Sequence, residues 1–308
     1  MKYLVLLFVL NFNAIQIDAI ALSESDAGQF IASIGRIEKV PGISFRATQT
    51  AEEFESTGHK SLNKLSYTRI VTGTLSPKGF FRFEIEYTEG NSIGQKYTVC
   101  FNGERSFFVN TKGNTNFLIT EKGKTTMNPF LFYANAIVEP FAFLSPNLLD
   151  PEDQGSYMTL ADLVNKKIWE EWLSNSKLEA SGTNEIQFLE REITSIRGGK
   201  KIMIVEVGSS DFLPKKITYK TRDNKIIEKR VINWQDVTSI NNGNYILPKH
   251  IEIEKYAENG NKVIITTNIE EIKIASDITD SVWSYDISKA ASIYDVNEKL
   301  LIPQNKSK

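Results

Sequence analysis

Two histidines are the only imidazole groups in the chain that could bind a metal or move a proton. His250, Glu252 and Glu254 alternate with isoleucines, so a strand would place all three on one face. Imidazole and carboxylate groups are suitable metal ligands, but a solvated outer face of a sheet explains the same alternation. His59 lies in the polar run 56–60, which predicts a surface loop.

The carboxylates and glycines form no recognisable catalytic motif. Glu170 and Glu171 are neighbours on a predicted helix and therefore point in different directions. The acidic run 150–153 lacks the spaced ligands of a calcium loop. Gly-x-Ser-x-Gly, His-Glu-x-x-His and phosphate-binding glycine motifs are absent from the sequence. We therefore predict no catalytic residue, no metal, no cofactor and no enzymatic activity; a hydrolase using His250 is the less favoured alternative.

The most informative cluster is the apolar stretch between residues 130 and 143. The residues that could contact a ligand are Phe130, Phe132, Tyr133, Ile137, Phe141 and Phe143. In one interpretation, they cover the open side of a sheet and complete its core. In the other, they line a cavity for an apolar ligand, because concave apolar surfaces are the usual small-molecule sites. The sequence leaves both interpretations open.

The largest local excess of positive charge lies between residues 215 and 230. It consists of Lys215, Lys216, Lys220, Arg222, Lys225, Lys229 and Arg230. Such residues could contact anionic head groups, where each contributes roughly 1 kcal/mol. Their alternation with apolar residues favours a different interpretation, in which they form the solvated face of a hairpin.

Residues 1–21 have the features of a cleavable secretory signal. Lys2 supplies the positive charge, residues 4–10 form the apolar core, and Ala19 and Ala21 are the small residues before the cleavage site. The apolar run is shorter than the roughly 20 residues needed to cross a bilayer. We expect export to the periplasm, with secretion as the alternative, and a single domain over residues 22–308.

Composition excludes some other classes of protein. The formal net charge of −2 argues against a dedicated nucleic-acid binder, which normally carries a strong positive excess. Cys100 is the only cysteine, so an internal disulfide is impossible, and its strand-like surroundings predict a buried, unreactive thiol. We expect a monomer.

The spacing of apolar residues predicts a helix before Pro41 and then a series of strands. Residues 81–87 alternate between apolar and charged side chains, as in an antiparallel sheet with one solvated face. The Asn102-Gly103 pair predicts a hairpin. Residues 201–207 are apolar on both faces, which is typical of a central strand. A helical segment between two sets of strands indicates an α+β fold with one large antiparallel sheet.

The order of these elements resembles that of bacterial outer-membrane lipoprotein carriers, the LolA/LolB-like proteins. The segments that carry the resemblance are the helix at 30–40 and the runs 43–50, 80–84, 97–104, 107–109, 213–217, 245–248 and 263–274. The resemblance implies a large antiparallel sheet curled into an unclosed half-barrel, with helices packed on the concave side. This chain departs from the pattern by a longer middle segment, which we expect to be a helical insertion at about 122–176.

The resemblance also implies a non-enzymatic function. Proteins of this kind bind lipid acyl chains or lipoproteins in the periplasm. We therefore expect an exported carrier of a hydrophobic ligand, with transient contacts to membrane proteins or anionic head groups. The alternative is a structural or interaction protein of the cell envelope that has no ligand cavity.

Overall fold

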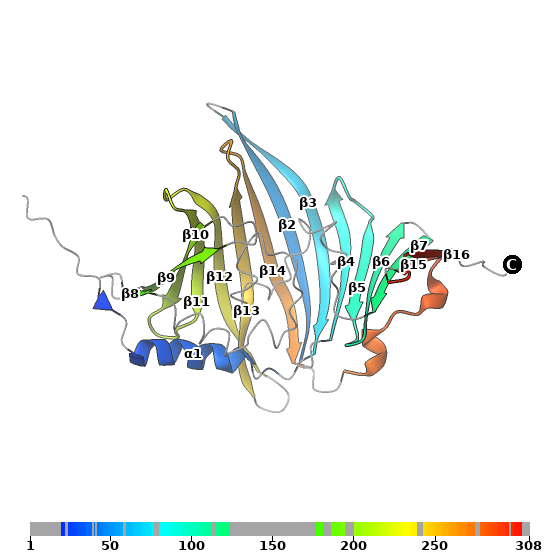
Figure 1. Cartoon of the computed structure of the whole chain (residues 1–308), viewed down its shortest axis with the longest axis horizontal. Helices are drawn as coiled ribbons and strands as arrows, with labels where there is room; N and C mark the ends of the chain where they lie inside the picture. The colour runs from blue at the N-terminus through cyan, green and yellow to red at the C-terminus, as the bar shows by residue number, and fades with distance from the viewer. Residues whose placement is uncertain are drawn as a thin grey trace, which may run out of the picture.

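The computed structural model describes one long helix, two short 3₁₀ helices and one large sheet (Figure 1). The described residues are 20–21, 24–38, 40, 42–57, 60–76, 80–112, 115–122, 177–180, 186–194, 200–238, 243–274, 278–295 and 297–303. The helices are α1 (Glu24–Glu38), η2 (Asp280–Trp283) and η3 (Ile287–Lys289). Helix α1 confirms the helix predicted before Pro41.

The sheet has sixteen strands within the described part of the chain. They are β1 (Ile20–Ala21), β2 (Ile43–Thr57), β3 (Lys60–Leu75), β4 (Phe81–Gly90), β5 (Lys96–Phe101), β6 (Arg105–Lys112), β7 (Thr115–Lys122), β8 (Lys177–Ala180), β9 (Ile186–Thr194), β10 (Lys200–Gly208), β11 (Pro214–Thr221), β12 (Ile226–Thr238), β13 (Asn244–Tyr256), β14 (Lys262–Ile274), β15 (Ser292–Asp295) and β16 (Leu300–Pro303).

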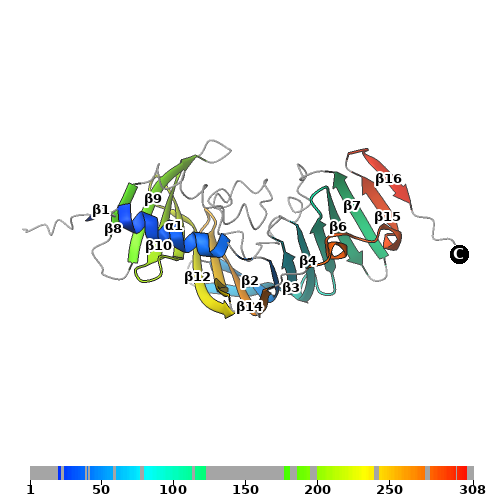
Figure 2. The same cartoon turned by 90° about the horizontal axis from the view of Figure 1, so that it is seen from below.

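The strand order shows two meanders joined side by side. It is β1-β8-β9-β10-β11-β12-β13-β14-β2-β3-β4-β5-β6-β7-β15-β16. Neighbouring strands are antiparallel throughout, except that β15 runs parallel to β7. Figure 2 shows that the sheet is curled and that its two ends stay apart. The predicted fold class is therefore confirmed: the sheet is an unclosed half-barrel.

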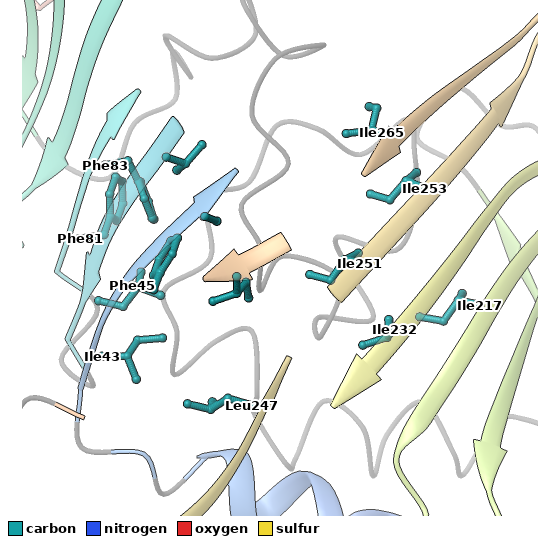
Figure 3. Packing of buried hydrophobic residues seen from close by; sticks show 14 of the residues in the cluster. Ile43, Phe45, Phe81, Phe83, Ile217, Ile232, Leu247, Ile251, Ile253 and Ile265 are labelled. Carbon is teal, nitrogen blue, oxygen red and sulfur yellow. The ribbon is translucent and has the colours of Figure 1, made fainter. Parts of the chain in front are cut away.

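Alternation along the strands separates a buried face from a solvated face. On β4, Phe83, Ile85 and Tyr87 are buried, whereas Glu84 and Glu86 between them are exposed. On β13, Ile251 and Ile253 are buried in the same way. Figure 3 shows Phe81 and Phe83 on one side and Ile251 and Ile253 on the other, with their side chains on the concave side of the sheet. The strand predicted at residues 81–87 is thus confirmed, together with its buried face.

Helix α1 lies across the ends of several strands of the meander β8–β14 (Figures 1 and 2). Its Phe30 and Ile31 side chains are buried and belong to the same apolar cluster as the concave side of the sheet. The Ser33 hydroxyl donates a hydrogen bond of 2.8 Å to the Phe212 carbonyl, which attaches the helix to the segment between β10 and β11. Among the described residues, no helix is both long enough and apolar enough to cross a membrane.

Other predicted elements are also confirmed. Strands β5 and β6 pair on either side of the turn with Gly103, whose φ of 93° is the left-handed conformation that glycine adopts easily. Strand β10 is flanked by β9 and β11, as its two apolar faces predicted. Of the signal segment, only Ile20–Ala21 is described, where it pairs with β8. Most of the predicted insertion at 122–176 lies outside the described residues.

The structure of the C-terminal segment 278–303 was not predicted from the sequence. Its strand β15 extends the sheet beyond β7, and its residues cover the outer side of β5–β7. The cluster formed there consists of Cys100, Phe107, Val109, Leu118, Ala290 and Ile293. Cys100 is fully buried in this cluster, which confirms its predicted burial.

Gly73 on β3 offers a test of the packing on the concave side. A Cβ atom at Gly73 would lie 2.2 Å from the Phe45 ring and 2.9 Å from the Phe83 ring. We expect Gly73→Ala to lower the free energy of unfolding by about 1–3 kcal/mol, because overpacking forces neighbouring rings to move. In α1, Gly28 has no atom within 4 Å of an added Cβ. We expect Gly28→Ala to be stabilising by up to about 1 kcal/mol.

Urea unfolding of the two variants and the parent measures both effects. The control is matched in chemistry, since each variant adds one methyl group to a glycine. Equal changes in stability, or a stabilising effect of Gly73→Ala, would contradict the described packing of the rings around Gly73.

Candidate functional site

The concave side of the sheet, which we call the inner face, is predominantly apolar. Its buried side chains come from both meanders and form one cluster. Those labelled in Figure 3 are Ile43, Phe45, Phe81, Phe83, Ile217, Ile232, Leu247, Ile251, Ile253 and Ile265. Because concave apolar surfaces with few polar groups are typical ligand sites, the inner face is the candidate functional site.

Aromatic rings are concentrated on one part of the inner face. The rings of Phe81 and Phe83 stack with their centroids 5.4 Å apart, and the Phe45 centroid lies 6.2 Å from that of Phe83. Phe101 on β5 extends the group, with its centroid 6.0 Å from Phe81. Gly73 lies between Phe45 and Phe83 in register, so its missing side chain leaves room for both rings. The result is a broad aromatic surface across β2–β5.

A first polar group on the inner face is centred on Arg69 of β3. Arg69 is only 1% exposed. Its Nε donates to Gln49 Oε1 at 2.8 Å, its Nη2 donates to the same oxygen, and its Nη1 donates to the Tyr87 hydroxyl at 2.9 Å. Gln49 in turn donates from Nε2 to the Thr267 hydroxyl at 2.8 Å. These bonds connect β4, β3, β2 and β14 across the middle of the sheet.

A second polar group is the ion pair of Arg230 and Glu228 on β12. Both side chains are buried, and Arg230 Nε donates to Glu228 Oε1. The Arg230 guanidinium also lies 5.4 Å from the centroid of the Tyr219 ring. Burial by itself would lower the pKa of Arg230, but the adjacent Glu228 carboxylate raises it above its ordinary value. Arg230 therefore stays charged, and the charge is neutralised within the chain.

The predicted ligand-contacting residues lie outside the described residues. They are Phe130, Phe132, Tyr133, Ile137, Phe141 and Phe143, and His59 is outside as well. His250 lies on β13 next to the inward-facing Ile251, so it belongs to the outer face, where its Nδ1 is hydrogen-bonded to Asn268 Oδ1 at 2.7 Å. In the described part of the chain, no group of three or more His, Cys, Asp and Glu residues could hold a metal ion.

The basic residues between 215 and 230 do not all lie on the solvated face of the sheet. Five of them pair with carboxylates: Lys215 with Asp211, Lys216 with Glu206, Arg222 with Glu192, Lys229 with Glu254, and Arg230 with Glu228. The prediction that the whole run forms a solvated face is wrong for Arg230, which is buried on the inner face. In this part of β12 the buried residues are Glu228, Arg230 and Ile232, whereas Lys229 and Val231 between them are partly exposed.

Arg69, Gln49 and the Glu228–Arg230 pair were not predicted from the sequence. A signal was present for Arg69, because alternation places it on the same strand face as Tyr67 and Val71. A charged residue at such a position is unusual and marks a site where charge must be compensated.

The first prediction from these burial patterns concerns the thiol of Cys100. Burial raises the pKa of this thiol to about 12. Because the thiolate is the nucleophile, we expect no reaction of the native protein with a disulfide reagent at about pH 8, and complete reaction after unfolding in urea. The pKa of the same thiol in the unfolded chain is about 8.5. As pH rises above that value, the thiol ionises in the unfolded chain but not in the folded protein, so the free energy of unfolding falls. Rapid reaction of the native thiol would contradict the burial.

The second prediction concerns the buried ion pair. We expect Arg230→Met to destabilise the protein by about 3–5 kcal/mol, because it leaves Glu228 buried without its partner. Replacing both partners by apolar residues, in Glu228→Leu with Arg230→Met, should recover most of the loss. The control is Arg222→Met, which breaks an exposed pair and should cost less than about 1 kcal/mol. Equal losses for Arg230→Met and Arg222→Met in urea unfolding would contradict this prediction.

No protein-family model and no curated protein sequence matches this chain. Among solved structures, it is similar to a DUF1329 family protein from Desulfovibrio piger, with 11% identity and a TM-score of 0.46 over 85% of this chain and 96% of that chain. It is also similar to a LolA superfamily protein from Nitrosomonas europaea, with 12% identity and a TM-score of 0.40 over 83% of this chain and 97% of that chain. The second of these proteins bears the name of the superfamily that the order of elements resembles.

Proposed function

We propose that the protein is an exported, non-catalytic binder or carrier of a hydrophobic ligand, such as a lipid acyl chain or a lipoprotein, in the cell envelope. The observation that carries the proposal is the inner face, where apolar side chains from both meanders line one concave side of an unclosed sheet. Such a surface binds apolar ligands by removing their surface from water, at about 25 cal/mol per Å². The predicted signal segment supports the assignment to the envelope.

The described part of the inner face supports binding rather than catalysis. Its buried charged side chains are Arg69, Arg230 and Glu228, and a nucleophile next to a general base is not among the described residues of this face. His250 lies on the opposite face of the sheet, so the hydrolase alternative would have to place its chemistry away from the apolar surface.

A bulky residue on the inner face tests the proposal. Ala51 is buried on β2 and pairs in register with Ile265 of β14 and Tyr67 of β3. We expect Ala51→Trp to weaken binding of Nile red, a neutral apolar dye, by about 10-fold or more, because the indole occupies the surface that the ligand needs. The matched control is Thr72→Trp, which places the same ring on the exposed outer side of β3 and should leave dye binding unchanged.

Dye fluorescence titration and native mass spectrometry of detergent-free protein provide the measurements. The urea midpoint of each variant shows whether it is folded. If the parent protein binds no dye and carries no lipid, the proposed function is wrong. If Ala51→Trp and Thr72→Trp bind the dye equally, the ligand does not use the inner face.

A further inference from the structure

Arg69 places a buried positive charge on the inner face, and no carboxylate of the described residues pairs with it. Among the described residues, its hydrogen-bond partners are the Gln49 amide and the Tyr87 hydroxyl. Its guanidinium also lies 4.9 Å from the centroid of the Tyr67 ring and 5.6 Å from that of Tyr87. An amide, a hydroxyl and two aromatic rings orient the guanidinium, but none of them carries a negative charge.

The hydroxyl of Tyr67 does not supply that charge. Burial raises the pKa of Tyr67, and the opposing effect of Arg69 is smaller, so the phenol stays protonated at neutral pH. Burying a charge without a counter-ion is costly, and such charges are normally paired or neutralised. Arg230 on the same face follows this rule, since it is paired with Glu228. Arg69 therefore differs from Arg230 in needing an anion from elsewhere.

Donors for such an anion are present. A guanidinium has five N–H groups, and three of them donate to Gln49 and Tyr87, which leaves two. Within the described part of the chain, the buried Tyr67 hydroxyl has no hydrogen-bond partner. Two guanidinium N–H groups and a phenol O–H are suited to the oxygens of a carboxylate or a phosphate.

The surroundings of Arg69 are suited to the rest of an amphiphilic ligand. Val71, Ala51 and Ile85 flank it on β3, β2 and β4, and all three are buried on the inner face. From β3 the apolar surface continues over β2, β14 and β13 toward β12. A ligand with an anionic head at Arg69 could therefore lay an alkyl chain along this surface without leaving it.

We propose that Arg69 and Tyr67 form a head-group site that selects amphiphiles with one alkyl chain and a negatively charged oxygen head, such as a long-chain carboxylate. This inference rests on the proposed function, since the alkyl chain would occupy the inner face. It adds a charge preference that an apolar surface alone does not provide.

The test compares ligands on the unaltered protein by displacement of Nile red. Dodecanoate and its methyl ester share an alkyl chain and differ in charge; dodecyl phosphate has the other oxyanion head, and acetate has no chain. We expect dodecanoate to bind about 10-fold or more tightly than the ester, because its charged head forms stronger hydrogen bonds with the Arg69 guanidinium than the neutral ester does. Stronger displacement by dodecyl phosphate than by dodecanoate would identify phosphate as the preferred head, and acetate should displace nothing.

Two variants test whether Arg69 and Tyr67 cause the preference for dodecanoate over its ester. Arg69→Met should bind the acid and the ester equally, and Tyr67→Phe, which removes only the hydroxyl, should weaken dodecanoate binding about 5-fold while leaving the ester unchanged. Arg46→Met is the control, because Arg46 is 45% exposed on the neighbouring strand and pairs with Glu270. It should keep the full preference for the acid. If Arg69→Met does not fold, the ligand comparison on the parent and the Tyr67→Phe variant decide.

The outcomes separate this inference from the function on which it rests. Equal binding of dodecanoate and its ester by the parent protein would overturn the head-group site and leave the proposed function standing. An acid preference that persists in Arg69→Met would also overturn it. If neither ligand displaces the dye and the dye itself does not bind, the proposed function fails as well.

Discussion

The pairing of β2 with β14 is the interaction on which the rest of the structure depends. It joins strands that lie more than 200 residues apart and holds the two meanders in one sheet, with Ile43 opposite Ile274 at one end and Phe54 opposite Lys262 at the other. Without it, each meander would expose a long unpaired edge, which is a site for aggregation. The hydrogen bond from Gln49 to Thr267 crosses this junction on the inner face, so the polar group around Arg69 and the joined sheet depend on each other.

The register of that pairing decides which side chains line the inner face. Because successive residues in a strand alternate between faces, a slip by one position would move the whole apolar set to the solvent side. The register puts Ile265 beside Ala51, and Thr267 beside Gln49, so apolar residues meet apolar ones and the polar pair can form its hydrogen bond. Packing, hydrogen bonding and strand pairing therefore all favour the same alignment.

Local patterns predicted the local elements and not the contacts between distant ones. The alternation at residues 81–87 and the Asn102-Gly103 turn were sufficient for β4 and for the β5–β6 hairpin, because both depend on neighbouring residues. The junction of β2 with β14 and the parallel addition of β15 to β7 have no such local signal. At Arg230, charge was taken to mean solvent exposure, and the buried partner Glu228, two positions earlier, was overlooked.

The two buried arginines make the two ends of the inner face electrostatically different. Arg230 on β12 is neutralised by Glu228, whereas Arg69 on β3 is hydrogen-bonded to the neutral side chains of Gln49 and Tyr87. Four strand spacings separate them, or about 19 Å along the sheet at roughly 4.8 Å per strand. The Ile251, Ile253 and Ile265 side chains lie between these ends. An uncharged ligand would gain nothing from one orientation over the other, whereas an anionic amphiphile would be held with its head at β3. Without a ligand, the charge of Arg69 has no counter-ion among the described residues, and this lowers the stability of the protein. Functional sites commonly reduce stability in this way.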